Sequence, residues 1–168
     1  MKHFLREFEK EVTSRLREAP SFIQVILGPR QVGKTSGILH VLEKNFSVDD
    51  YSYFSCDDDF YDGQWFLRHI QQADRDGKKI LVFDEIQKLE NWSRLVKSVW
   101  DNKKRQKKMI HIVLLGSSSL QLTLGLQESL AGRFEVIPVH HWSACESRDA
   151  YGLNFNEFLQ FGGYPGSY

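Results

Sequence analysis

Short runs of apolar residues alternate along the chain with longer segments whose apolar residues recur every three or four positions. The short runs have the length and β-branched content of buried strands, whereas the longer segments have the spacing of amphipathic helices. Strands are expected at residues 22–27, 51–55, 80–83, 109–115 and 134–139. Helices are expected over residues 2–18, 36–44, 120–130 and 155–161, and around 65–70 and 92–100. This alternation predicts an α/β fold, with a parallel sheet covered by helices on both faces.

Composition places the chain among ordinary soluble domains. It has 168 residues, of which 41% are hydrophobic and 26% charged, and this is enough for one domain with a sizeable core. Lys and Arg balance Asp and Glu at 22 each, so overall charge gives no case for nucleic acid or an acidic membrane surface. Cys56 and Cys145 are far apart and lie in no metal-binding spacing. Without a membrane-spanning stretch or a signal-peptide core, the sequence predicts a cytoplasmic protein that does not enter the membrane.

Residues 28–35 form a complete phosphate-binding motif, G-x-x-x-x-G-K-[ST], between an expected strand and an expected helix. Gly28 and Gly33 let the backbone curl so that successive N–H groups point at phosphates, and the dipole of the following helix adds to the attraction. Lys34 supplies a charge for the β- and γ-phosphates, and the Thr35 hydroxyl is a ligand for Mg²⁺. The expected nucleotide-binding residues are Gly28, Pro29, Arg30, Gln31, Val32, Gly33, Lys34, Thr35 and Ser36.

A second apolar run ends in two acids, Asp84 and Glu85. Open α/β sheets bind ligands at the carboxyl ends of their strands, which is where Asp84 is expected. Asp84 is therefore expected to share Mg²⁺ with Thr35, and Glu85 to orient or deprotonate an attacking water. The alternative is an acidic helix N-terminus that follows a core strand.

Five motifs occur in a fixed order: the phosphate loop, then Phe-Asp-Glu-Ile-Gln-Lys, Leu-Gly-Ser-Ser-Ser, Ser-Leu-Ala-Gly-Arg and a closing Gly-Gly-Tyr-Pro. Together they resemble the prokaryotic AAA+-like ATPases that join an N-terminal ATPase domain to a C-terminal domain of unknown function. The resemblance covers about residues 20 to 166. It implies an ATP-binding P-loop domain with a five-stranded parallel sheet, a helical lid and a DNA-binding-like region further on.

The resemblance also implies roles for two later residues. Ser117 stands where such ATPases keep a polar sensor of the γ-phosphate, although it also fits a serine turn in which Ser118 or Ser119 caps the next helix. Arg133 stands where relatives place an arginine finger, which stabilises transition-state charge from a neighbouring subunit of a homo-oligomer. The alternative for Arg133 is a surface position or an ion pair within the chain.

We expect residues 1–150 to form the P-loop ATPase domain with its N-terminal amphipathic helix, and residues 151–168 to begin a truncated lid or C-terminal region. A protein or DNA partner would then bind through the missing C-terminal part. The basic run at residues 103–108 is interpreted as a solvated loop that ends a helix, with phosphate contacts to DNA as the alternative.

The function expected from these residues is Mg²⁺-dependent binding of ATP and hydrolysis at its β–γ bond. One alternative is a nucleotide-gated switch or interaction module, associated with DNA, that hydrolyses little. The other is a small-molecule phosphotransferase, against which Glu85 argues because such an enzyme excludes water. The preference for ATP over GTP depends on the resemblance alone.

Overall fold

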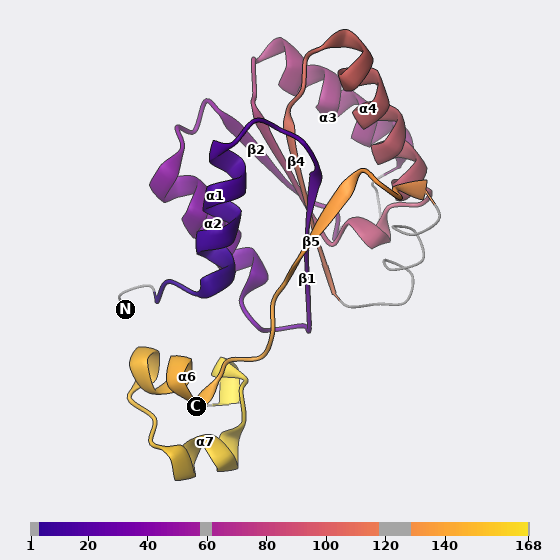
Figure 1. Ribbon diagram of the computed structural model, residues 1–168. Coiled ribbons are helices and arrows are strands. Elements are labelled where there is room, and N and C mark those ends of the chain that lie inside the picture. Colours follow the sequence, from indigo (N-terminus) through magenta and orange to yellow (C-terminus); the bar gives the residue numbers. More distant parts are fainter. Residues whose placement is uncertain (1–3, 58–61, 118–128, 168) are drawn as a thin grey trace.

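A sheet of five parallel strands forms the centre of the molecule, in the order β2-β3-β4-β1-β5 (Figure 1). The computed structural model describes residues 4–57, 62–117 and 129–167. The strands are β1 (Ile23–Gly28), β2 (Tyr51–Ser55), β3 (Ile80–Asp84), β4 (His111–Ser117) and β5 (Phe134–Pro138). The expected strands are present and pair in parallel, which confirms the predicted α/β fold.

Two pairs of helices cover the two faces of the sheet. One face carries α1 (Glu7–Arg17) and α2 (Lys34–Asn45), and the other carries α3 (Gly63–Arg75) and α4 (Trp92–Gln106). Successive strand residues point to opposite faces. In β3, Phe83 therefore packs in the cluster that includes α3 and α4, whereas Val82 packs in the cluster with α1 and α2. Because both of their faces are buried, the inner strands β1, β3 and β4 appear in the sequence as nearly continuous apolar runs.

The first helix is shorter than the apolar pattern predicts. It begins at Glu7 rather than near residue 2, and Arg6 before it has an extended backbone. Phe4 instead packs against Trp142, with ring centroids 5.7 Å apart. α1 approaches α2 closely at Gly37, where a Cβ atom would lie 2.3 Å from Cζ of Phe8. The absence of a side chain at Gly37 thus allows these two helices to pack together.

The strand register brings the predicted functional segments to one edge of the sheet. Gly28, at the end of β1, pairs with Ser117 at the end of β4. Asp84, at the end of β3, pairs with Ser55 of β2. Strand β5 is the edge strand next to β1 and ends at Pro138, which has no backbone N–H to donate and so suits the end of an edge strand. The phosphate loop, the acids and the serine therefore share the carboxyl edge.

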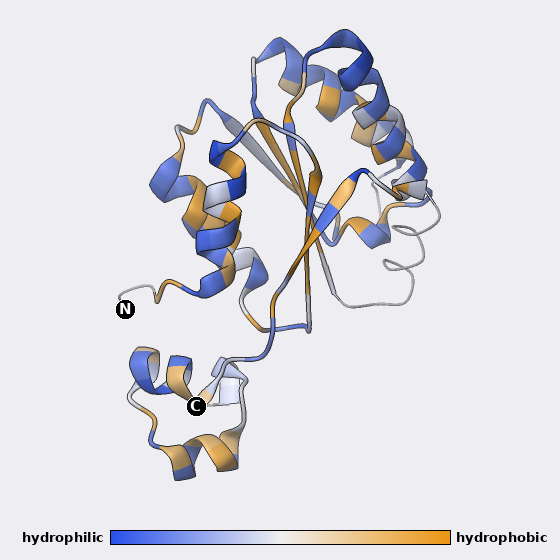
Figure 2. Cartoon of the chain, viewed as in Figure 1, coloured by the Kyte–Doolittle hydropathy of each residue, from blue (hydrophilic) through white to orange (hydrophobic). Residues whose placement is uncertain are grey.

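The segments after β5 form α6 (Ala144–Tyr151), α7 (Phe155–Phe161) and the short 3-10 helix η2 (Pro165–Ser167), which lie beyond the carboxyl edge of the sheet (Figure 1). Helix α7 has no buried residue and exposes apolar side chains. Much of its ribbon has the orange of hydrophobic residues in Figure 2. The division predicted at residue 150 falls within the last turn of α6 and stays a prediction. Most of the helix expected at 120–130, with Ser118 and Ser119, lies outside the described residues. Among the described helices, none is long and apolar enough to span a membrane.

Candidate functional site

The phosphate loop connects β1 to α2, and one of its two glycines has a left-handed backbone. Gly33 immediately precedes α2 with φ of +92°, a left-handed value that residues with a Cβ rarely adopt. Lys34 folds back across the loop, and its Nζ donates hydrogen bonds to the carbonyl oxygens of Gly28 at 2.9 Å and Pro29 at 2.5 Å. Burial lowers the pKa of Lys34, and the charges of Glu85 and Asp84 oppose that shift. Carbonyl groups of the loop backbone thus hold the lysine ammonium group over the loop.

Asp84 is a buried acid that three other groups contact. Its Oδ2 accepts hydrogen bonds from Oγ1 of Thr35 at 2.6 Å and from the Tyr53 hydroxyl at 2.7 Å. Its Oδ1 accepts a hydrogen bond from the backbone N–H of Glu85 at 2.9 Å. The structure therefore brings together Thr35 and Asp84, the two residues that the sequence suggested as ligands of Mg²⁺. Tyr53 was not expected here, because a tyrosine in a strand gives no sign of which acid it will meet.

The donor set at Thr35 and Asp84 suits a hard cation that keeps part of its hydration shell. A hydroxyl and a carboxylate are oxygen ligands, as Mg²⁺ prefers, and Mg²⁺ is usually bound by one or two carboxylates with substrate phosphates and water. In the described ranges, no three His, Cys, Asp or Glu side chains lie close enough to hold a metal by themselves. The residues present therefore fit Mg²⁺ that arrives with a phosphate, rather than an ion caged by protein alone.

Glu85 faces the same region from a strained position. Its φ is +51°, and it immediately precedes the 3-10 helix η1 (Ile86–Lys88). One carboxylate oxygen accepts a hydrogen bond from the Gln87 side-chain amide, whose own Oε1 is buried without a hydrogen-bond partner among the described residues. Glu85 lines an open cleft of about 570 Å³ together with Lys34 and Thr35. The cleft is also lined by Arg30, Gln31, Gly33, Ser36, Asp57 and Lys88.

The two residues suggested only by resemblance lie at opposite ends of the sheet. Ser117 is half-buried beside Gly28, next to the start of the phosphate loop. Arg133 lies at the amino edge, where its carbonyl oxygen accepts a hydrogen bond from the N–H of Ile23. Its guanidinium binds both carboxylate oxygens of Asp101, at 2.8 and 3.1 Å. Arg133 is therefore not brought to the phosphate loop of its own chain, and it forms the intrachain ion pair that was the alternative.

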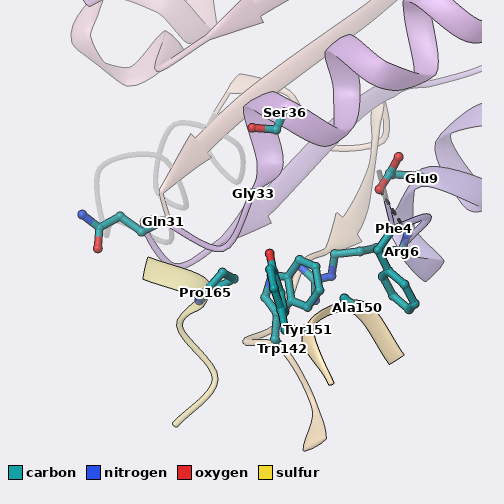
Figure 3. Close-up of a pocket in the computed structure, with 10 residues that line it drawn as sticks. All are labelled: Phe4, Arg6, Glu9, Gln31, Gly33, Ser36, Trp142, Ala150, Tyr151 and Pro165. Carbon is teal, nitrogen blue, oxygen red and sulfur yellow. Dashed lines mark hydrogen bonds between the residues drawn. The ribbon is translucent and has the colours of Figure 1, made fainter. Parts of the chain in front are cut away.

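A second pocket, of about 350 Å³, adjoins the other side of the phosphate loop (Figure 3). It shares Gln31, Gly33 and Ser36 with the cleft, so the two spaces meet at the loop. The rings of Trp142 and Tyr151 lie 5.2 Å apart in its wall. The remaining lining residues are Phe4, Arg6, Glu9, Ala150 and Pro165. Sequence reasoning missed this pocket because its aromatic residues come from both ends of the chain and form no local motif.

Arg6 ties the phosphate loop to the segments around this pocket. It is only 6% exposed, and its guanidinium donates to the carbonyl oxygen of Val32 at 2.8 Å and to Glu146 at 2.9 Å. The same group lies 4.8 Å from the ring centre of Trp142, whose Nε1 also donates to the carbonyl oxygen of Val32. A third hydrogen bond goes to the carbonyl oxygen of His140. Arg6 was not predicted from sequence either.

Comparisons with known proteins agree with this architecture. The chain is 30% identical to the uncharacterized protein MJ1544 of Methanocaldococcus jannaschii, over 87% of this chain and 36% of that protein. A RuvB structure from Thermotoga maritima superposes with a TM-score of 0.56 at 17% identity, over 87% of this chain and 49% of RuvB. The chain thus spans about a third of the first protein and half of the second. A family model described as an AAA domain matches residues 21–159, and the chain therefore belongs to this AAA domain family.

Proposed function

We propose that this domain binds Mg²⁺-ATP and hydrolyses the bond between its β- and γ-phosphates. The contact of 2.6 Å between Thr35 and Asp84 carries the proposal, because it joins the end of the phosphate loop to the acid of β3. A phosphate on the loop would therefore lie beside two oxygen ligands for its cation. Membership of the AAA domain family supports nucleotide binding by this site.

The loop and its lysine would bind the phosphates. The backbone N–H groups of the loop and the N-terminus of α2 attract anions, and Lys34 adds a full positive charge. Thr35 and Asp84 would hold Mg²⁺, which when bound offsets negative charge on the phosphate oxygens. Tyr53 orients the Asp84 carboxylate through its hydrogen bond. Ser117, which pairs with Gly28 at the carboxyl edge of the sheet, would position the attacking water.

Glu85 is the proposed general base. A carboxylate in the cleft accepts the proton of water as the oxygen attacks the γ-phosphate, and correct orientation is needed for that transfer. The Gln87 amide, which binds one oxygen of Glu85, leaves the other oxygen available to water. We assign Gln87 the role of orienting Glu85.

The aromatic pocket is the proposed site of the nucleoside. It begins at Gly33 and Ser36, so a base and ribose attached to loop-bound phosphates would reach it without crossing the catalytic cleft. Stacking on Trp142 and Tyr151 would provide apolar contact area for a planar base.

One observation favours a second function, a nucleotide-gated switch with little hydrolysis. Arg133, the candidate for stabilising transition-state charge, is paired with Asp101 in its own chain and lies far from its own phosphate loop. Its proposed role in trans requires a second copy of this chain. Without that copy, bound ATP would remain unhydrolysed. Arg6 would then transmit occupancy of the loop to α6 through Val32 and Glu146.

The test is phosphate release from Mg²⁺-ATP by the chain and its Glu85→Gln variant across a range of protein concentrations. We expect the variant to bind ATP normally and lose about 100-fold or more of turnover, since general-base catalysis contributes about 10²–10⁴-fold. Glu90→Gln, an exposed acid outside the cleft, is the matched control. Retained turnover in Glu85→Gln would exclude Glu85 as the base.

The concentration series separates the two functions. Turnover that rises more steeply than protein concentration supports Arg133 acting in trans. Binding without measurable release in the wild-type chain favours the switch.

A further inference from the structure

A groove of about 660 Å³ runs along the solvent face of α4, away from the nucleotide site. It is lined by Arg94, Lys97, Ser98, Asp101, Lys104, Arg105 and Arg133, and we call it the α4 groove. The α4 members are spaced by three or four residues or are direct neighbours, so they form one stripe on the helix. None of them lines the phosphate-loop cleft or the aromatic pocket.

The structure divides the basic run at residues 103–108 into parts with different environments. The run was interpreted as a solvated loop, but α4 continues through Gln106. Lys103 is 4% exposed and forms an ion pair with Asp74. Lys104 and Arg105 line the groove, whereas Lys107 and Lys108 are exposed outside it. Two members of the run therefore join a cationic surface that the sequence alone did not define.

The single acid of the groove does not neutralise its cations. Asp101 is bound through both oxygens by Arg133, and this interaction lowers the pKa of Asp101, with further contributions from Lys97 and Arg105. In the part of the chain that the structure describes, the other four cations form no ion pair. These four are Arg94, Lys97, Lys104 and Arg105. The α4 groove thus carries a local charge of about +4 on a chain whose net charge is zero.

We propose that the α4 groove binds the phosphate backbone of duplex DNA. From Arg94 to Arg105 the helix rises about 16 Å. One strand of a duplex places about five phosphates along that length of its axis. The four cations that form no ion pair within the described ranges match this density of charge. All the residues that line the groove are charged or polar, whereas the core of a protein interface is usually rich in apolar and aromatic residues. Because contacts to phosphates alone do not read the bases, the proposed binding is independent of base sequence.

The experiment is a fluorescence-anisotropy titration of a labelled 30-base-pair duplex with the chain, at several salt concentrations. Four phosphate contacts predict that log K falls against log salt with a slope of about −3.6. The double variant Lys104→Gln/Arg105→Gln should weaken binding and reduce the slope by about 1.8, and Arg94→Gln/Lys97→Gln should do the same. Two duplexes of unrelated sequence should bind equally.

Lys107→Gln/Lys108→Gln is the matched control, because it removes the same charge from exposed positions next to the groove. An equal loss in this control would contradict the proposal, as would no binding at low salt. Polyaspartate is the competitor that separates DNA from an acidic protein. If it competed as effectively per charge as unlabelled DNA, the partner would be an acidic protein and the proposal would be wrong. The remaining alternative is that the α4 groove is an interface between copies of this chain, and sedimentation velocity tests it. If the groove variants abolished ATP-dependent self-association and left DNA binding unchanged, that alternative would hold and the proposal would be wrong.

Discussion

The two sides of the phosphate loop are built from different kinds of structure. On the cleft side, Lys34 begins α2, Asp84 ends the buried strand β3 and Tyr53 lies in the half-buried strand β2, and hydrogen bonds hold each of them. On the pocket side, Trp142 and Tyr151 come from segments after the sheet, next to helices that expose apolar side chains. A rigid scaffold can fix charged groups to fractions of an ångström, which the proposed chemistry needs. Stacking on a base tolerates a more adaptable support.

The largest expected effect tests the cleft side. Lys34→Ala removes the charge that Nζ brings to the phosphates, and charge-assisted hydrogen bonds contribute about 1.5–3 kcal/mol each. We expect ATP to bind about 100-fold more weakly, measured by titration with a fluorescent nucleotide. Lys44→Ala, an exposed lysine in the last turn of the same helix, should bind ATP normally. Unchanged affinity in Lys34→Ala would remove the loop as the nucleotide site.

A smaller effect tests the pocket side. Tyr151→Ala removes a ring that lines the pocket. Because Tyr151 is 40% exposed, the fold should tolerate the change. We expect ATP to bind about tenfold more weakly, because an aromatic contact and its buried area are lost. Tripolyphosphate, which has no base, should bind equally to variant and wild type. Phe155→Ala, which removes an exposed ring of α7 outside the pocket, is the control. If tripolyphosphate also bound more weakly, the tyrosine would act on the loop and not on the base.

This contrast explains how much the sequence could predict. The strand, loop and helix around Gly33 are adjacent in sequence, so the motif specified their arrangement locally. The acids at Asp84 and Glu85 were identified because a buried strand ended in them, and parallel pairing brought that end to the loop. Both inferences used only local pattern and the general geometry of α/β sheets.

The missed residues depend on contacts between distant segments. Arg6 and Glu146 are separated by 140 positions, and Tyr53 and Asp84 by 31. Arg6 falls in the first turns of the amphipathic helix expected over residues 2–18, where a charged residue is usually solvated, so nothing local indicated its burial. The pairing of Arg133 with Asp101 was likewise hidden, because both are ordinary charged residues in the sequence.

The cleft can be tested more finely through Tyr53. Tyr53→Phe removes only the hydroxyl that orients Asp84, and one hydrogen bond contributes about 1 kcal/mol, or roughly fivefold in an equilibrium constant. We expect about fivefold more Mg²⁺ to be needed for half-maximal ATP affinity, with ATP binding in EDTA unchanged. Tyr51→Phe, on the same strand and equally half-buried, is the matched control. An unchanged Mg²⁺ requirement would show that the hydroxyl contributes only to packing.

The smallest effect concerns the link between the two sides, the ion pair of Arg6 with Glu146. Burial acts to raise the pKa of Glu146, but hydrogen bonds from Arg6 and Ser143 outweigh it and lower the pKa overall. A carboxyl group with a lowered pKa stabilises the fold fully above its unfolded pKa, about 4.3, and loses that contribution as pH falls through the folded value. Glu146→Gln should therefore lower Tm at pH 7 by roughly 3–6 °C, which corresponds to about 1.5 kcal/mol in a domain of this size.

The same link predicts how that difference in Tm depends on pH. Because protonation removes the charge from the wild-type carboxylate, the gap between wild type and Glu146→Gln should shrink as pH falls from about 5 towards 3. Thermal unfolding followed by circular dichroism measures the gap, and Glu7→Gln, in an exposed pair with Lys10, should show almost none at any pH. A gap that stays constant down to pH 3 would mean that the side chain acts through its shape and hydrogen bonds alone. The connection from the phosphate loop to α6 would then not depend on charge.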